Sequence, residues 1–166
     1  MEAIGEQQSI KNKSWRYTFE SDRGGIRLEH EVLEIARVVR VVKGGRRFRF
    51  RASVVVGDRM GHVGFGVGKS RDVQSAIQKA QARAAKNLIA VPLVKTTIAH
   101  PVGAKGDGTI VLLKPARPGT GIIAGGTVRV VADLAGIKDL VAKTYGSTNK
   151  INNARATLKA LQNLRK

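Results

Sequence analysis

The chain has 166 residues and a mass of 17.8 kDa, which suits one ordinary domain or two small domains that share an interface. Thirty Lys and Arg residues against twelve Asp and Glu residues give a net charge of +18 and a pI near 11.2, a balance that favours a polyanionic partner and argues against most small-molecule enzymes. The chain has no cysteine, which excludes a disulfide framework, a thiolate metal site and a cysteine nucleophile.

Membrane and export signals are also missing from the sequence. No stretch approaches the ~20 apolar residues of a membrane span, so no membrane partner is expected. The opening residues, Met1 to Gln8, are acidic and polar, unlike the basic start and apolar centre of a secretory signal. We therefore expect the protein to stay in the compartment where it is made.

The excess of positive charge begins after residue 34. Residues 1–34 carry five basic and seven acidic side chains, residues 35–91 carry thirteen and two, and residues 92–166 carry twelve and three. Residues 1–27 show no sustained apolar period and contain Gly24-Gly25, which predicts a flexible extension. Within it, the alternating aromatic residues from Trp15 to Phe19 fit a short strand, packing on the body of the protein, or stacking on bases.

A first domain is predicted over residues 28–92, with three strands and one helix. Residues 28–35 fit either a short helix or a strand that leads into the β-branched stretch 36–42. Gly44-Gly45 predicts a reversal into a second strand that ends at Val56, and residues 62–67 are a third strand after a turn at 57–61. Ser70 is the predicted N-cap of a helix that ends before Pro92.

Side chains alternate clearly in two of these strands. In the second strand, Phe48 and Phe50 are predicted to share one face, with Arg47, Arg49 and Arg51 on the other. In the third strand, one face is nearly all glycine. These glycines are Gly64, Gly66 and Gly68.

A second domain is predicted over residues 93–166. Residues 93–99 and 109–114 are predicted strands on either side of a turn at 103–108, and a Gly- and Pro-rich loop follows from 115 to 126. Residues 127–135 fit a helix stopped by Gly136. The next segment, residues 137–145, is short, and its residue pattern is mixed. Asn152 or Asn153 is predicted to cap a final helix.

The segment from Arg37 to Arg51 is the strongest candidate for a nucleic-acid contact. Its seven cations occur without a single acid, whereas an ordinary solvated surface would include acids. Their mutual repulsion on a hairpin hinged at Gly44-Gly45 is relieved by neighbouring anions, so the segment is predicted to bind nucleic acid. The cations are Arg37, Arg40, Lys43, Arg46, Arg47, Arg49 and Arg51.

Two glycine-rich segments have the composition of phosphate-binding loops. The first ends in Gly68-Lys69-Ser70 but lacks P-loop spacing, because Val63 stands where the first glycine is required; nucleotide hydrolysis is therefore not predicted. Bare backbone beside Lys69 would still suit an RNA phosphate, and close helix packing explains the glycines equally well. The second segment, residues 119–126, fits a phosphate cradle or a close packing turn.

No catalytic residue, metal site or cofactor is predicted. The three histidines, His30, His62 and His100, lack a spaced acid and nucleophile, and the aspartates are too scattered to form a catalytic pair. His62 is more consistent with a turn or an RNA contact than with a general base.

Five blocks of sequence carry a specific resemblance. They are Val41 to Arg46, Val55 to Asp58, Gly61 to Lys69, Gly119 to Gly126 and Tyr145 to Asn149. In this order they resemble the small-subunit ribosomal protein S-five family in its bacterial form. The resemblance extends from about residue 28 to about residue 164 and does not cover the first 25 or so residues.

The resemblance implies an α+β fold. A domain similar to the double-stranded-RNA-binding fold, with a three-stranded antiparallel sheet and a helix, is expected to precede a two-layer α/β domain. The second domain would contain a left-handed βαβ crossover, against the usual right-handed preference. The implied function is a non-enzymatic structural role in the small ribosomal subunit, with binding to its ribosomal RNA, a contribution to translational accuracy and a part in forming the mRNA entry channel.

The resemblance also implies partners and site residues. Ribosomal proteins S-four and S-eight are expected neighbours, with S-three nearby, in ribosomes of the cytoplasm or an organelle, and no independent homo-oligomer is expected. The family's hairpin pattern corresponds to Lys43, Gly44, Gly45 and Arg46, and its glycine-rich strand to Gly64, Gly66, Gly68 and Lys69. Further candidate RNA contacts are His62, Thr120, Gly121 and Asn149. The alternative is a free architectural protein of the nucleoid type, which would also bind B-form duplex.

Overall fold

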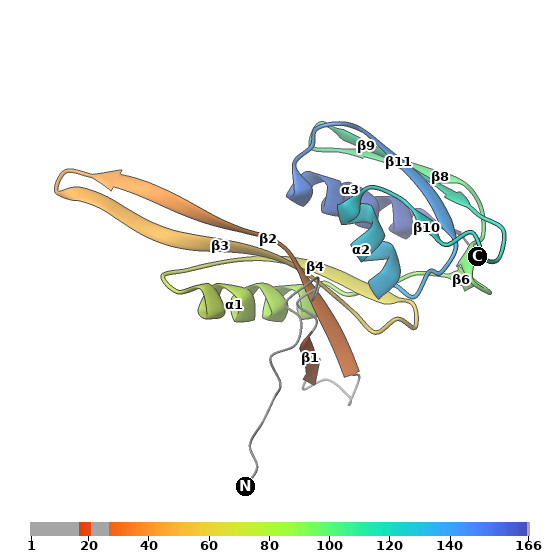
Figure 1. The fold of residues 1–166 in the computed structure, drawn as a ribbon, viewed down its shortest axis with the longest axis horizontal. Helices are drawn as coiled ribbons and strands as arrows, with labels where there is room; N and C mark the ends of the chain where they lie inside the picture. The colour runs from red at the N-terminus through yellow and green to blue at the C-terminus, as the bar shows by residue number, and fades with distance from the viewer. Residues whose placement is uncertain (1–16, 21–26, 166) are drawn as a thin grey trace, which may run out of the picture.

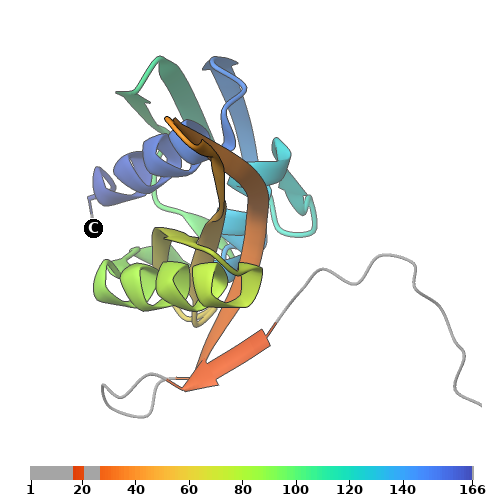
Figure 2. The same cartoon turned by 90° about the vertical axis from the view of Figure 1, so that its left-hand side faces the viewer.

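The computed structural model describes residues 17–20 and 27–165, which form two packed units (Figure 1). Four layers follow one another: helix α1, a five-stranded sheet, the helices α2 and α3, and a four-stranded sheet (Figure 2). Most of the extension predicted over residues 1–27 lies outside the described residues. Among the described helices, none combines the length and apolar character needed to cross a bilayer.

The N-terminal unit is an antiparallel sheet with strand order β1-β2-β3-β4-β5 and helix α1 on one face. Residues 28–35 are strand rather than helix, because β2 runs for 16 residues with one register shift between Val32 and Glu34. Short strands at each edge extend the predicted three-stranded sheet. One of them confirms the strand alternative for Tyr17 to Phe19, and the rest of the aromatic segment lies outside the described residues. The strands are β1 Tyr17–Glu20, β2 Arg27–Val42, β3 Gly45–Gly57, β4 His62–Ser70 and β5 Ile89–Ala90.

Helix α1, Val73–Lys86, begins later than the sequence predicted. Its N-cap is Asp72, whose carboxylate accepts a hydrogen bond from the Ser75 backbone N–H at 3.2 Å. The predicted cap, Ser70, is still paired with Phe50 in the sheet, so the helix can begin only after the chain leaves β4. Three alanines of α1 are fully buried against the sheet: Ala76, Ala80 and Ala84.

The C-terminal unit is a four-stranded sheet with strand order β10-β11-β9-β8, covered on one face by α2 and α3. Strands β10 and β11 are parallel and are joined through α2, which makes the expected βαβ unit; its hand stays a prediction. The elements are β6 Leu93–Val94, β7 Thr97–Ile98, β8 Val102–Gly106, β9 Thr109–Pro115, β10 Ile122–Ile123, α2 Gly126–Leu134, β11 Leu140–Gly146 and α3 Lys150–Gln162.

Three boundaries of this unit differ from the sequence prediction. The predicted strand 93–99 is a tight hairpin of β6 and β7, with Lys95 at a φ of 54°. The predicted turn 103–108 is mostly strand β8, and its reversal is confined to Asp107-Gly108, where both φ values are positive. The predicted caps Asn152 and Asn153 lie inside α3.

One apolar cluster joins the two units. Val55, Val63 and Phe65 lie on the side of the first sheet that faces away from α1, and they belong to the same buried cluster as Val131 and Leu134 of α2. Burial of aliphatic side chains is the main favourable contribution of such a cluster. The units therefore share a core.

The turn between β3 and β4 reinforces this junction. The backbone N–H groups of Arg59 and Gly61 donate to the carbonyls of Leu134 and Ala135 at 3.0 and 3.1 Å, which satisfies acceptors that a helix end leaves open. A Cβ at Gly57 would lie 2.2 Å from the Leu134 oxygen, so this approach requires glycine. The Arg59 side chain also pairs with two carboxylates, Glu29 at 3.0 Å and Asp133 at 3.6 Å.

Candidate nucleic-acid interface

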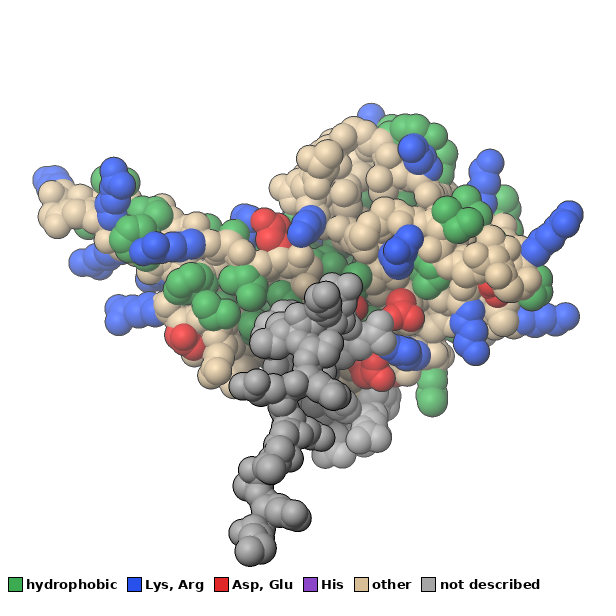
Figure 3. Space-filling model, in the orientation of Figure 1, with side chains coloured by type: hydrophobic (Ala, Val, Ile, Leu, Met, Phe, Trp, Pro, Cys, Tyr) green, Lys and Arg blue, Asp and Glu red, His purple; other side chains and the backbone are tan. Residues whose placement is uncertain are grey.

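The β2–β3 hairpin extends beyond α1 as an arm, defined here as residues 35–51 (Figure 1). Its two turn residues are Lys43 and Gly44, and Gly45 follows at a φ of 135°, which favours glycine. Residues 43–49 are all exposed. Lys and Arg side chains project along the arm in Figure 3, so the cations predicted as one cluster are brought together there.

One face of the arm is basic, as the alternation predicted. Arg40 lies opposite Arg47, and Arg51 lies opposite Lys69 of β4, and Arg49 shares this face by the two-residue period. Like charges directly opposite one another destabilise a sheet. Because residues 35–57 contain no Asp or Glu, the anions that relieve this repulsion have to come from outside the arm.

The other face of the arm carries most of its large apolar side chains, together with Arg37 and Arg46. Ile35, Val39, Val41 and Phe48 are 43–75% exposed, and register places them on the face that α1 covers nearer the root of the hairpin. The Arg37 guanidinium carbon lies 3.8 Å from the centroid of the Phe48 ring, a cation–π contact. The arm thus offers phosphate contacts on one face and apolar and planar surfaces for sugars and bases on the other.

The glycine-rich strand β4 serves helix packing. Gly64, Gly66 and Gly68 are buried beneath α1, and a Cβ on Gly66 would lie 2.1 Å from the carbonyl oxygen of Ala80. This corrects their assignment as RNA contacts, because the helix covers the backbone that a phosphate would approach. Lys69 is exposed on the basic face and keeps its candidate role.

His62 stabilises the turn that precedes β4. Its Nδ1 lies 2.6 Å from Asp58 Oδ2, and the backbone N–H groups of Met60 and His62 donate to Asp58 Oδ1 at 2.7 and 2.9 Å. Burial raises the pKa of Asp58, but these hydrogen bonds outweigh burial and hold the pKa below its ordinary value of 3.8. The turn role of His62 is confirmed, and its RNA contact stays a prediction.

The predicted phosphate cradle around Gly121 holds an anion of the protein itself. The Gly121 N–H donates to Oδ1 of the buried Asp139 at 2.9 Å. This bond, the Thr96 side chain and the N–H groups of Gly119 and Thr120 lower the pKa of Asp139 below 3.8, although burial raises it. Gly121 therefore has a structural role and is half-buried, while the Thr120 side chain is exposed; the RNA contacts of both residues stay predictions.

Asn149 is the N-cap of α3, and its side-chain oxygen accepts from the Ile151 backbone N–H at 2.9 Å. The residue is exposed, and its RNA contact stays a prediction. Beside it, Lys150 Nζ donates to the Leu33 carbonyl at 3.2 Å and ties α3 to the root of the arm. Sequence reasoning missed this contact because the two residues are 117 positions apart.

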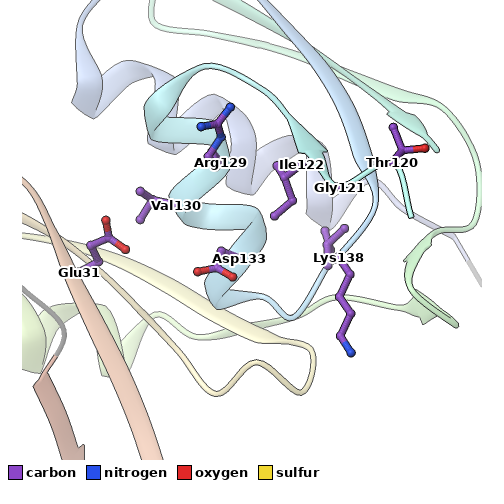
Figure 4. A pocket seen from close by; sticks show the side chains of 9 residues that line it. Glu31, Thr120, Gly121, Ile122, Arg129, Val130, Asp133 and Lys138 are labelled. Atoms are coloured by element: carbon purple, nitrogen blue, oxygen red, sulfur yellow. The ribbon is translucent and has the colours of Figure 1, made fainter. Parts of the chain in front are cut away.

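A hollow of about 690 Å³ lies between β2 and α2 (Figure 4). Its charged lining residues balance one another: Glu31 and Asp133 against Arg129 and Lys138. That balance does not suit a polyanion. Among the described residues, no group of three or more His, Asp or Glu side chains is placed to hold a metal ion.

Comparisons with known proteins assign both units. Residues 28–92 match the family described as "Ribosomal protein S5, N-terminal domain", and residues 104–166 match "Ribosomal protein S5, C-terminal domain". A relative named "Small ribosomal subunit protein uS5", from Chloroflexus aurantiacus, is 54% identical over 139 residues, which cover 84% of this chain and 78% of that protein. A protein of the same name from Buchnera aphidicola is 52% identical over 140 residues, covering 84% of this chain and 85% of that protein.

Proposed function

Because the chain belongs to the ribosomal protein S5 family, we propose that it is a structural component of the small ribosomal subunit and binds the ribosomal RNA through its arm. The family is one of non-enzymatic ribosomal proteins. The observation that carries the RNA-binding part is the basic face, where Arg40 and Arg47 lie opposite one another. Phosphates that neutralise such a pair relieve its repulsion and release their own counterions.

The two faces of the arm indicate how it binds. The basic face suits the phosphate backbone of one RNA segment, and the apolar face with the Arg37–Phe48 pair suits the sugars and bases of another. An arm of this kind fits between RNA elements and recognises mainly their shape. The proposed RNA contacts are Arg37, Arg40, Lys43, Gly44, Gly45, Arg46, Arg47, Arg49, Arg51 and Lys69, with His62, Thr120 and Asn149 outside the arm.

The family resemblance supports further proposals. They are a contribution to translational accuracy, a part in the mRNA entry channel, and contacts with ribosomal proteins S-four and S-eight, with S-three nearby. Cytoplasmic ribosomes are the proposed location. The proposed domain boundaries are residues 28–92 and 93–166, after an extension of residues 1–27.

Sedimentation of native protein from a lysate tests the proposed function. The sedimented particles are washed at moderately high salt, which removes basic proteins held only by weak charge contacts. We expect retention with small ribosomal subunits. Release into the soluble or DNA-bound fraction, together with equal affinity for B-form duplex and folded RNA at matched salt, would instead support the architectural alternative.

A further inference from the structure

The hollow between β2 and α2 lies at the junction of the two units (Figure 4). Its apolar wall is formed by Ile122, Val130 and Ile137, of which the first two are only half-buried. Its volume of about 690 Å³ falls in the range of roughly 300–1,000 Å³ that is usual for ligand sites. The hollow can therefore receive large apolar side chains.

Two carboxylates line the hollow from opposite sides, Glu31 on β2 and Asp133 on α2 (Figure 4). The register pairs Glu31 with Val55 of the shared core, so its side chain lies on the α2 side of the sheet. Both carboxylates are half-buried, and neighbouring cations stabilise the charged form of such groups. Asp133 already has one such neighbour in Arg59. This part of the hollow suits further cations that arrive together with apolar side chains.

The lining favours a peptide over RNA as the occupant. Carboxylates repel phosphates, whereas a peptide can bring cations for the two carboxylates and acids for the two exposed cations of the lining, Arg129 and Lys138. An occupant that carries both signs of charge and a large apolar side chain is therefore complementary to the hollow.

The chain enters the first sheet beside this hollow. Strand β1 begins at Tyr17, which pairs with His30, the residue next to Glu31. Because β1 is antiparallel to β2, the start of β1 rather than its end lies toward Glu31. Residues 1–16 precede this point and lie outside the described residues. Eight residues can span about 26 Å when extended, so the stretch 9–16 is long enough to reach across the hollow.

The composition of residues 9–16 is complementary to the lining. The stretch contains no acid. Trp15 offers a large apolar surface together with an N–H donor, and residues 1–8, which carry two acids and no Lys or Arg, are complementary to the exposed cations of the hollow. The apolar and basic residues of the stretch are Ile10, Lys11, Lys13, Trp15 and Arg16.

We propose that residues 9–16 dock in the hollow between β2 and α2, with Trp15 against its apolar wall and the cations beside Glu31 and Asp133. The docked segment links β2 of the first unit to α2 of the second. Of the alternatives that the sequence leaves open for the aromatic residues, this assigns Trp15 to packing on the protein rather than to stacking on bases. The family match begins at residue 28, so the docking is independent of the proposed function.

The fluorescence of Trp15, the one tryptophan of the chain, tests the docking in the purified full-length protein. We expect emission at shorter wavelength than that of free tryptophan and slow quenching by acrylamide, because the wall of the hollow excludes water. Glu31→Lys should shift the emission to longer wavelength and raise the quenching constant toward that of free tryptophan. Val130→Asp replaces this variant if circular dichroism shows that Glu31→Lys does not fold.

Glu34→Lys is the matched control for this experiment. It makes the same change of charge on the same strand, outside the lining of the hollow. Emission and quenching of Trp15 should stay as in the unmodified protein. Equal changes in the Glu31 and Glu34 variants would contradict docking at the hollow, because they would reflect net charge alone.

Photo-cross-linking then locates the segment. The full-length variant Trp15→p-benzoylphenylalanine is irradiated at low protein concentration, alone and with small-subunit rRNA, and the products are identified by mass spectrometry. We expect cross-links within one chain to peptides that contain Glu31 or residues 129–138, with and without RNA.

Several outcomes would overturn the docking and leave the ribosomal function standing. They are cross-links only to RNA, to a second copy or to other parts of the chain, no cross-link at all, and a Trp15 in the unmodified protein that is quenched like free tryptophan. Failure of the protein to sediment with small subunits would overturn the proposed function without affecting this inference, since both docking experiments use the protein free of ribosomes.

Discussion

The arm and the outer face of the C-terminal sheet, which is the side away from α2 and α3 where Ile110, Leu112 and Val141 are exposed, combine the same kinds of side chain in different arrangements. Both are exposed sheet surfaces with cations and aliphatic side chains and without acids. On the arm, Arg40 lies directly opposite Arg47, whereas Arg46 and Arg49 lie opposite valines. On the sheet, each lysine lies opposite an aliphatic side chain. A cation pair directly across the strands, which net charge does not reveal, therefore distinguishes the arm from the sheet.

The largest expected effect is the loss of RNA affinity when three positive charges are removed from the arm. Arg40→Ala, Arg47→Ala and Arg49→Ala together should lower affinity for small-subunit rRNA by on the order of 10²-fold at ~0.15 M salt. The magnitude of the slope of log affinity against log salt should fall by about 2 to 3.

The matched control removes Lys105, Lys114 and Lys143, which changes the net charge by the same amount. Its rRNA affinity should change by less than about threefold, because dispersed lysines outside the contact contribute only long-range attraction. Filter-binding titrations over a range of salt concentrations measure both variants. Equal losses in the two variants would mean that total charge, rather than arrangement, determines RNA binding.

A second prediction concerns the strand at the root of the arm. Gly66→Ala should lower the free energy of unfolding by about 1–3 kcal/mol, because its Cβ would lie 2.1 Å from a carbonyl of α1. Gly44→Ala at the tip meets nothing within 4 Å and should change stability by less than about 0.5 kcal/mol. Urea unfolding measures both. A stable Gly66→Ala variant with weakened RNA binding would return this strand to the RNA interface.

A third prediction concerns the acid stability of the loop that Asp139 joins to the start of β11. The pKa of Asp139 is lowered in the folded protein, so its stabilising contribution is present at neutral pH and is lost as the pH falls below 3.8 through the folded-state pKa. Asp139→Asn should be less stable than the unmodified protein at neutral pH and should lack this part of the acid-induced loss. Unfolding curves between pH 7 and pH 2 measure the free energy of unfolding of both proteins. Identical pH profiles would contradict the prediction.

The smallest expected effect is at the exposed ion pair beside the β8–β9 turn. Arg155 Nη1 lies 3.3 Å from Asp107 Oδ2, and both side chains are more than half exposed. Arg155→Ala should therefore cost less than about 1 kcal/mol, because water and salt screen such a pair. A larger fall in the free energy of unfolding, measured by heat or urea, would show that the β8–β9 turn and its sheet depend on this contact.

Much of the arm could be predicted from local sequence. Alternation of Phe48 and Phe50 with arginines is a property of neighbouring residues, and the strand period of two turns it directly into two faces. The glycine pair marked the reversal, and the missing acids indicated an anionic partner. The helix starts were predicted less well. By sequence, Ser70 and Asp72 are both suitable N-caps, but Ser70 is still paired in the sheet, so the helix begins after Asp72.

The sequence by itself determined the strands of the arm, its concentration of charge and its resemblance to a ribosomal family, because local period and composition carry that information. Only the tertiary structure decided what the glycines do. Gly66 packs beneath α1, and the loop at Gly121 receives the carboxylate of Asp139, 18 residues away. It also decided which face of the second sheet stays open, since α2 and α3 cover one side and leave Leu112 on the other. Such outcomes depend on which distant segments meet, and a local pattern does not encode that.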